Sequence, residues 1–189
     1  MIWVPIYLNR IHEMGTGEIG SYLALLIGVG GAIGIYAGGR LADYMAAKFG
    51  TQWLPWIVAI ANLISIPFLW FAFFADSASN ALWAYALPAA LGTLYVGPGF
   101  ALVQNRTPVE MRSVAAAINL FILNIIGLGA GPFFVGVMSD HFEPSYQVDG
   151  LRYALACTLL VVLWGAGHYA RAGVHLANAG KNSTAESSG

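Results

Sequence analysis

The stretch SVAAAINLFILNIIGLGAGPFFVGVMS, residues 113–139, contains no charged side chain, and it decides the fold class. About 20 mostly apolar residues in helical form cross the hydrocarbon core of a bilayer, so this stretch is long enough to span a membrane. Stretches of the same kind lie at residues 19–39, 51–75 and 77–105, and residues 153–170 carry only one histidine. The sequence therefore predicts an all-α membrane protein that crosses the bilayer several times.

Composition excludes a soluble globular protein and a nucleic-acid-binding protein. Charged residues make up 9% of the chain and hydrophobic residues 58%, whereas about a quarter of the residues of a soluble domain are charged. With 8 Lys and Arg residues and a formal net charge of -1, the chain has no basic surface to neutralise a nucleic-acid backbone. We therefore expect membrane lipids around the chain and no binding of nucleic acid.

Polar residues divide the chain into spans and a tail. The apolar start of the chain ends at Asn9 and Arg10, too early for a complete span, so we interpret it as a truncated helix in the back part of a longer protein. The last residues are small and polar, with little to bury, and predict disorder. The predicted transmembrane unit covers residues 1–171, with spans at about 1–9, 19–41, 53–75, 81–104, 108–138 and 151–171, and the predicted disordered cytoplasmic tail covers residues 172–189.

The positive charges of the loops predict the orientation in the membrane, because short cytoplasmic loops hold the excess of Lys and Arg. Loops on one side of the predicted bundle contain only two basic residues, Arg10 and Arg152. The side with more positive charge is predicted to be cytoplasmic, which makes this a multi-pass protein of the cell (inner) membrane with its C-terminus inside. The basic residues on that side are Arg40, Lys48, Arg106, Arg112, Arg171 and Lys181.

Thr107, Pro108 and Glu110 form a capping-box pattern with proline at the first helical position. In such a box the threonine hydroxyl and the glutamate carboxylate each accept a hydrogen bond from a backbone N–H that the helix leaves unpaired. The pattern predicts that a span begins here, in a cytoplasmic loop that also contains Arg112.

Glycines recur every four residues in two of the spans. Gly30, Gly34 and Gly38 fall on nearly one face of one helix, and Gly127 and Gly131 do the same in another. Small residues let a second helix approach closely, and such close packing associates helices in lipid. We call each of these two rows of glycines a glycine ridge. Each ridge is compatible with static packing of helices or with an interface along which two bundles move.

The ends of the same two spans match each other. Residues 39–43 and residues 136–140 both read glycine, three residues, aspartate. The charge count places the first copy at the cytoplasmic face and the second at the outer face, three spans later. These features predict three-helix units repeated with inverted topology, a common construction of secondary transporters.

The stretch GRLADYMAAK, residues 39–48, resembles the loop signature of the major facilitator superfamily, in which glycine, an apolar residue and aspartate precede a basic cluster. The resemblance implies a gating motif whose aspartate contacts the N-terminal end of a helix in the opposite half of the transporter. Arg40 and Lys48 are alternative local partners for Asp43, and a solvated carboxylate is the remaining alternative. The pattern is kept at Gly39, Leu41, Asp43 and Lys48.

Segments along the rest of the chain share a second pattern. They are residues 10–14 and 97–104, then Pro108, Met111 and Arg112, then residues 124–132 and 151–154. They resemble the spinster-like branch of the same superfamily. The resemblance implies the C-terminal six-helix half of a twelve-helix transporter, with its first helix cut and the N-terminal half missing. It also implies alternating access around a central cavity, proton coupling in many members, and lipid-type solutes.

Few polar groups lie inside the predicted spans, and in lipid such groups need partners or water. Asn124 is near the middle of a span, where it lines a cavity or forms a hydrogen bond between helices. No Asp, Glu, Lys or Arg lies well inside a complete span, so ion or proton coupling is expected mainly in the missing N-terminal half. The notable polar residues are Asn62, Thr93, Tyr95, Asn119 and Asn124, and the possible cavity-lining residues are Tyr7, Tyr95, Asn119 and Asn124.

These features together predict secondary transport of a small organic or lipid-like solute rather than catalysis. Ser139, Asp140 and His141 are consecutive, so no separate nucleophile and base can be paired. The sequence has no spacing typical of metal ligands, and we expect no cofactor. The alternative is a non-transporting membrane scaffold or accessory subunit.

Overall fold

The computed structural model describes the backbone of residues 2–186 and the side-chain surroundings of residues 2–179, and within this range it is helical, with no strand. This confirms the all-α prediction. The π-helical turn η1 (Ala24–Val29) joins α2 to α3 without a break, and η3 (Ile125–Ala130) joins α7 to α8. The helices are α1 (Trp3–His12), α2 (Thr16–Leu23), α3 (Gly30–Phe49), α4 (Trp53–Phe73), α5 (Ala78–Leu94), α6 (Val96–Asn105), α7 (Arg112–Asn124), α8 (Gly131–Tyr146) and α9 (Gly150–Glu186).

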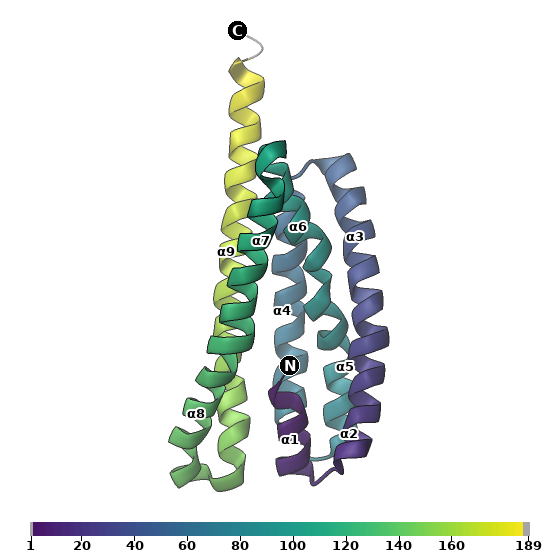
Figure 1. Cartoon of the computed structure of the whole chain (residues 1–189), viewed down its shortest axis with the longest axis vertical. Coiled ribbons are helices and arrows are strands. Elements are labelled where there is room, and N and C mark those ends of the chain that lie inside the picture. The colour runs from purple at the N-terminus through teal and green to yellow at the C-terminus, as the bar shows by residue number, and fades with distance from the viewer. Residues whose placement is uncertain (1, 187–189) are drawn as a thin grey trace.

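Several helical segments are long and apolar enough to cross a membrane. Within the described chain they are Thr16–Phe49, Trp53–Phe73, Ala78–Asn105 and Val109–Ala179. The last segment turns back on itself at η4 (Gln147–Asp149), so α9 runs antiparallel to α7 and α8 (Figure 1). We call the end of the bundle where α5 and α9 begin the Arg152 end, and the end where α7 begins the Arg112 end.

Local sequence accounts for the ends of several helices. Ser77 caps α5 by accepting a hydrogen bond at 3.3 Å from the backbone N–H of Asn80. Glu13 ends α1 in the left-handed conformation, and Asn9 fixes the following turn by donating to the carbonyl of Met14 at 2.9 Å. Gly50 ends α3 with φ of 89°, a conformation that glycine adopts without steric cost.

The span that begins near Thr107 lacks the predicted capping bonds. Its first turn is the 3-10 helix η2 (Val109–Met111), which has no side-chain cap, and α7 follows at Arg112. The Thr107 hydroxyl instead donates to the carbonyl of Val103 at 2.7 Å, because Pro108 is extended and moves the start of the helix beyond the reach of Thr107. The location of the start was predicted correctly, but the capping contacts were not.

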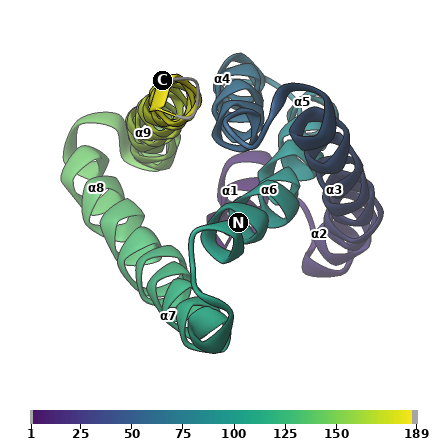
Figure 2. The same cartoon turned by 90° about the horizontal axis from the view of Figure 1, so that it is seen from above.

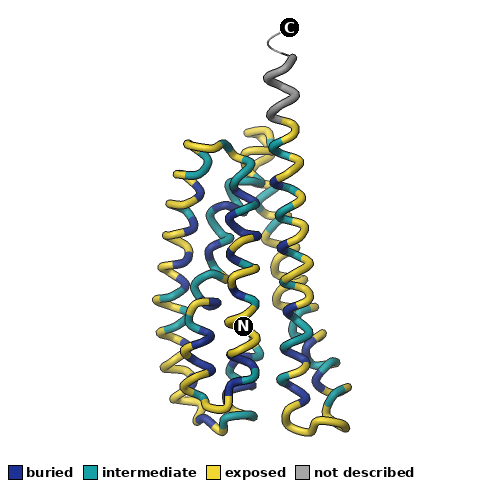
Figure 3. The backbone as a smooth tube through the Cα atoms, turned by 180° about the vertical axis from the view of Figure 1, so that it is seen from behind, coloured by how far each residue is buried: buried dark blue, intermediate teal, exposed yellow. Residues whose placement is uncertain are grey.

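Helix packing leaves one part of the chain uncovered. Helix α4 packs against α5 and α9, α3 packs against α5, and α8 packs against α9. Seen from above, α7 stands apart from α3, α4 and α5, and the chain then passes through α8 to α9 (Figure 2). Buried residues gather where α1, α4, α5 and α9 face one another (Figure 3), whereas α7 and η3 contain no buried residue.

Helix α9 extends past the predicted end of its span at residue 171. It runs to Glu186, through residues for which the sequence predicts a disordered tail. The segment after Arg171 contains several alanines, which favour helix. Residues 187–189 lie outside the described residues.

Candidate functional site

The glycine ridge of α3 packs directly on the backbone of α5. A Cβ atom on Gly34 would overlap the carbonyl oxygen of Ala90, and one on Gly38 would overlap the carbonyl oxygen of Leu94. Gly30 lies at the edge of this contact, where a Cβ would be 3.9 Å from Ala90. This ridge therefore makes the close helix contact that its spacing predicts.

Two polar features of α5 and α6 reinforce this contact. The Thr93 hydroxyl lies 3.0 Å from the carbonyl oxygen of Gly31 on α3 and 2.9 Å from that of Ala90 on its own helix, and it donates to either. Pro98 has no N–H, so the carbonyl of Leu94, four residues earlier, loses its helical donor. That freed carbonyl is the group that faces Gly38.

The second glycine ridge has no such cover. A Cβ on Gly127 would meet no atom within 4 Å, and one on Gly131 would meet only the carbonyl of Ile126, at 3.4 Å. Every residue from 121 to 130 is exposed. No helix in the described part of the chain covers this surface, so close packing at Gly127 and Gly131 stays a prediction.

A cavity of about 370 Å³ lies between α1, α4, α5, α9 and the η3–α8 segment. Gly127 and Gly131 form part of its wall, so the bare ridge borders this cavity. The remaining walls are mostly apolar, and Trp3 of α1 closes one side by donating to the carbonyl of Pro132 at 3.0 Å. The polar side chains on its wall are Asn62, Ser65, Tyr85 and Thr158.

These four polar groups lie at similar depths along their helices. Tyr85 is seven residues into α5 and Thr158 eight residues into α9, both counted from the Arg152 end. Ser65 and Asn62 are eight and eleven residues before the end of α4 at the same side. At about 1.5 Å per residue, this corresponds to depths of about 10 to 17 Å from that end.

The predicted cavity-lining residues do not come together. Tyr7 is buried at the Arg152 end, and Asn124 is exposed, with its side-chain NH₂ donating to the carbonyl of Leu120 in its own helix at 2.7 Å. Tyr95 is half-buried where α5 meets α6, and Asn119 is half-buried on α7. None of the four is among the residues that line the cavity.

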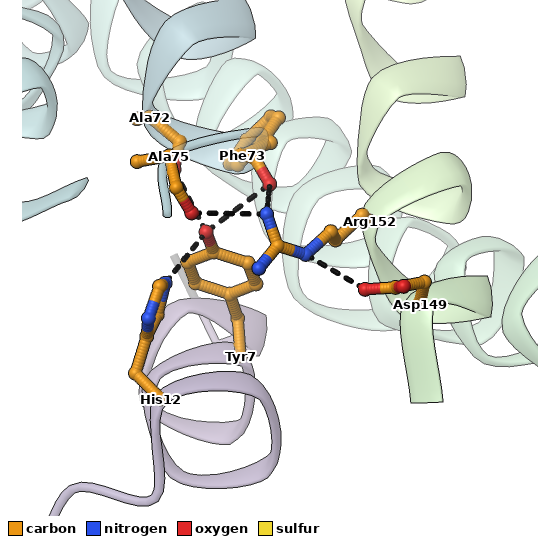
Figure 4. Close-up of polar contacts among 7 residues, drawn as sticks. All are labelled: Tyr7, His12, Ala72, Phe73, Ala75, Asp149 and Arg152. Carbon is orange, nitrogen blue, oxygen red and sulfur yellow. Dashed lines mark hydrogen bonds and ion pairs between the residues drawn. The ribbon is translucent and has the colours of Figure 1, made fainter. Parts of the chain in front are cut away.

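A compact polar cluster joins α1, α4 and α9 at the Arg152 end (Figure 4). The Arg152 guanidinium donates to the carbonyl oxygens of Phe73 at 3.3 Å and Ala75 at 3.0 Å, and it pairs with the Asp149 carboxylate at 3.0 Å. It therefore places a positive charge at the C-terminal end of α4, where the helix dipole favours a cation.

Tyr7 completes this cluster from α1. Its hydroxyl lies 2.8 Å from the carbonyl oxygen of Ala72, which accepts its hydrogen bond, and 3.0 Å from Nε2 of His12. The Arg152 guanidinium also lies 6.0 Å from the centre of the Tyr7 ring, a cation–π contact. Partial burial and, secondarily, the charge of Arg152 lower the pKa of His12 below its ordinary value.

The gating motif at residues 39–48 is helical in the structure. The predicted span ended at residue 41, before Asp43, but α3 continues to Phe49, because good helix formers fill these positions and the first glycine with positive φ is Gly50. Asp43 is exposed, and within the described chain the one ion pair joins Asp149 to Arg152. Arg40 is also exposed, and Lys48 donates to the Tyr44 hydroxyl at 3.1 Å.

Sequence reasoning missed the residues that the structure does bring together. Tyr85 was not among the predicted cavity-lining residues, yet it is buried and lines the cavity. Arg152 was counted only as a loop charge, although it caps α4. For Asn62, the sequence does contain a sign of its place on the cavity wall, because its side-chain amide lies in the middle of an apolar stretch.

Comparison with known proteins identifies relatives in one class of membrane protein. An MFS-type efflux pump of Mycolicibacterium smegmatis is 34% identical, over 80% of this chain and 35% of the relative. Protein spinster homolog 1 of Xenopus tropicalis is 26% identical, over 89% of this chain and 35% of the relative. No protein-family model matches the chain. The chain thus spans about a third of the length of the curated relatives it matches.

Proposed function

Because the chain belongs to the major facilitator superfamily, in its spinster-like branch, we propose that it forms the C-terminal half of a secondary active transporter. The transporter moves a small organic or lipid-like solute by alternating access. Ion or proton coupling runs through the N-terminal half, since no Asp, Glu, Lys or Arg lies well inside a complete span of this chain.

The bare surface of α7 and η3 is the observation that carries this proposal. Small residues on a membrane helix serve close approach by another helix, and Gly127 and Gly131 have this character with no helix over them in the described chain. The surface also borders the cavity. The match covers 35% of each of these two relatives, so the remainder of such a longer protein would supply the helices that cover it.

An inverted arrangement of two three-helix units is supported by a shared irregularity. In each proposed unit the middle helix contains a six-residue π-helical turn, η1 between α2 and α3 and η3 between α7 and α8. The two middle helices run in opposite directions between the ends of the bundle (Figure 1). π-helical turns are rare and frequently occur at functional sites, so their recurrence favours a repeat over coincidence.

A transport assay with separated halves tests the proposal. We expect cells that produce this chain alone to retain a lipophilic fluorescent dye as well as empty cells do. Cells that also produce the N-terminal half of the mycobacterial relative are expected to retain less dye. Dye export by the chain alone would contradict the proposal, and co-purification of the halves without export would favour the scaffold or accessory subunit.

The proposed orientation has its own test. A C-terminal green fluorescent protein is expected to fluoresce, and a C-terminal alkaline phosphatase to be inactive, because the basic Arg112 end lies in the cytoplasm. The reverse pattern would contradict the orientation.

A further inference from the structure

A groove of about 510 Å³ lies between α2, η1 and α5 at the Arg152 end. The first of its lining residues along the chain is Met14, so the truncated helix α1 forms no part of it. The groove also lies away from the bare surface of α7 and η3, because α2 and α5 stand apart from α7 (Figure 2). It is therefore separate from the surface that the proposed function assigns to the other half.

Two pairs of side chains, each spaced by four residues, line the two sides of this groove. Helix α2 contributes Glu18 and Tyr22, and α5 contributes Ser79 and Trp83. Residues four apart lie on the same side of a helix, one turn from each other. Both helices begin at the Arg152 end, so each places a polar group one turn nearer that end than an aromatic ring.

The lining of the groove changes from polar to apolar with depth. Glu18 and Ser79 lie in the first turns of α2 and α5. Tyr22 and Trp83 lie about 8 to 9 Å from the starts of their helices, and Leu25 lies about 14 Å from the start of α2, at about 1.5 Å per residue. Tyr and Trp concentrate at the membrane–water interface. This order of polar, aromatic and apolar groups matches the headgroup, interface and acyl chain of a phospholipid.

The polar end of the groove carries a negative charge. Glu18 is exposed, and the ion pair that the structure contains within residues 2–179 joins two other residues, Asp149 and Arg152. The rings of Tyr22 and Trp83, one turn deeper, attract cations at their faces. A carboxylate above two aromatic rings suits an ammonium group.

Ser79 suits the second charge of a zwitterionic headgroup. Its side chain is exposed, and no described residue forms a hydrogen bond with its hydroxyl. It lies in the first turn of α5, where the helix dipole favours an anion. A phosphate beside α5 and an ammonium group beside Glu18 are thus both accommodated.

A second groove, of about 350 Å³, lies on the other side of Trp83, between α4 and α5. Its lining is mostly apolar and includes Pro67, Phe68 and Phe71. Trp83 borders both grooves and is 78% exposed. Two grooves that flank one protruding ring match the two acyl chains of a phospholipid rather than a single chain.

We propose that α2, α4 and α5 bind one bilayer phospholipid with a primary ammonium headgroup, with Glu18 as the partner of the ammonium and Trp83 between the acyl chains. A primary ammonium is preferred to a quaternary one, because a carboxylate accepts hydrogen bonds that only N–H groups donate. The lipid is held and not transported, so the site goes beyond the proposed function and does not depend on it.

Native mass spectrometry of the full chain in a neutral detergent tests the headgroup preference. The probes are phosphatidylethanolamine, phosphatidylcholine and phosphatidylglycerol with identical acyl chains. We expect a first bound phosphatidylethanolamine at about tenfold lower lipid concentration than phosphatidylglycerol requires, with phosphatidylcholine in between. Equal binding of the three lipids would overturn the proposal.

The charge of Glu18 is tested by Glu18→Gln, which keeps the shape of the side chain. The variant is expected to lose the preference for phosphatidylethanolamine over phosphatidylglycerol. Glu143→Gln is the matched control, since Glu143 is an exposed carboxylate near the same end that lines neither groove. Glu18 also lies in the first turn of α2, where the helix dipole favours a carboxylate, so the readout is the headgroup preference and not stability. A preference that Glu18→Gln leaves unchanged would overturn the proposal.

The position of the lipid is tested by photo-cross-linking and by Trp83→Leu. A phosphatidylethanolamine with a diazirine on an acyl chain is expected to label α4 and α5 beside Trp83. Trp83→Leu is expected to weaken this labelling about fivefold. Trp164→Leu, at an exposed tryptophan of α9 outside both grooves, is expected to leave it unchanged. Labelling spread evenly over the apolar surface, or equal effects of the two variants, would mean that lipid binds without a site.

Discussion

Two glycine ridges with the same spacing have opposite surroundings in this molecule. The ridge at Gly34 and Gly38 lies against the carbonyls of α5, so close that no side chain fits. The ridge at Gly127 and Gly131 lies open beside a cavity. The same spacing therefore occurs in two settings, a close helix contact within the bundle and an open surface beside a cavity.

The largest expected effect separates the two ridges. Gly34→Val places a branched Cβ atom against the carbonyl of Ala90 and is expected to lower the free energy of unfolding by about 3 kcal/mol. Gly127→Val meets open space and is expected to change it by less than about 0.5 kcal/mol. Thermal unfolding of both variants in detergent measures the difference. Equal losses of stability would mean that both ridges are packed.

A second test compares the two arginines at the Arg152 end. Arg152→Gln removes the charged donor from the carbonyls of Phe73 and Ala75 and breaks the ion pair with Asp149, so we expect a loss of about 2 kcal/mol. Arg10→Gln alters an exposed side chain, and its effect is expected to be within about 0.5 kcal/mol. The same unfolding measurement applies. A larger loss of unfolding free energy for Arg10→Gln than for Arg152→Gln would contradict the assignment of Arg152 as the residue that stabilises this end.

The smallest expected effect is a dependence on pH. The folded protein holds the pKa of His12 below its ordinary value, so the unfolded chain takes up the proton first as the pH falls. Stability is therefore expected to decline below the ordinary histidine pKa of about 6.5, and to be insensitive to His12 above it. Unfolding between about pH 7.5 and about pH 5 measures this decline, which His12→Gln is expected to reduce. A decline that His12→Gln leaves unchanged would assign it to other groups.

Much of the fold was predictable from the sequence because charged residues interrupt apolar stretches that are long enough to span a membrane. The faces that each helix buries were not, since lipid is as apolar as a helix interface and hydropathy does not distinguish them. Tyr85 and Leu87 lie in the same apolar stretch, yet the first is buried and the second exposed. The role of Arg152 could not be predicted either. Its partners are backbone carbonyls at the end of α4, which every residue type has, so the sequence does not show which of them accept its hydrogen bonds.

The central claim is that the bare ridge borders a cavity that admits water rather than ordinary lipid, and thiol labelling tests it most directly. In a Cys157→Ala background, cysteine is placed at Gly127 or, as a control, at Trp164, which is 69% exposed on α9 and does not line the cavity. The chain in nanodiscs is then treated with a membrane-impermeant thiol reagent. We predict that the cysteine at position 127 reacts much faster than the one at position 164, because the cavity admits water. Equally slow reaction at both positions would contradict the account.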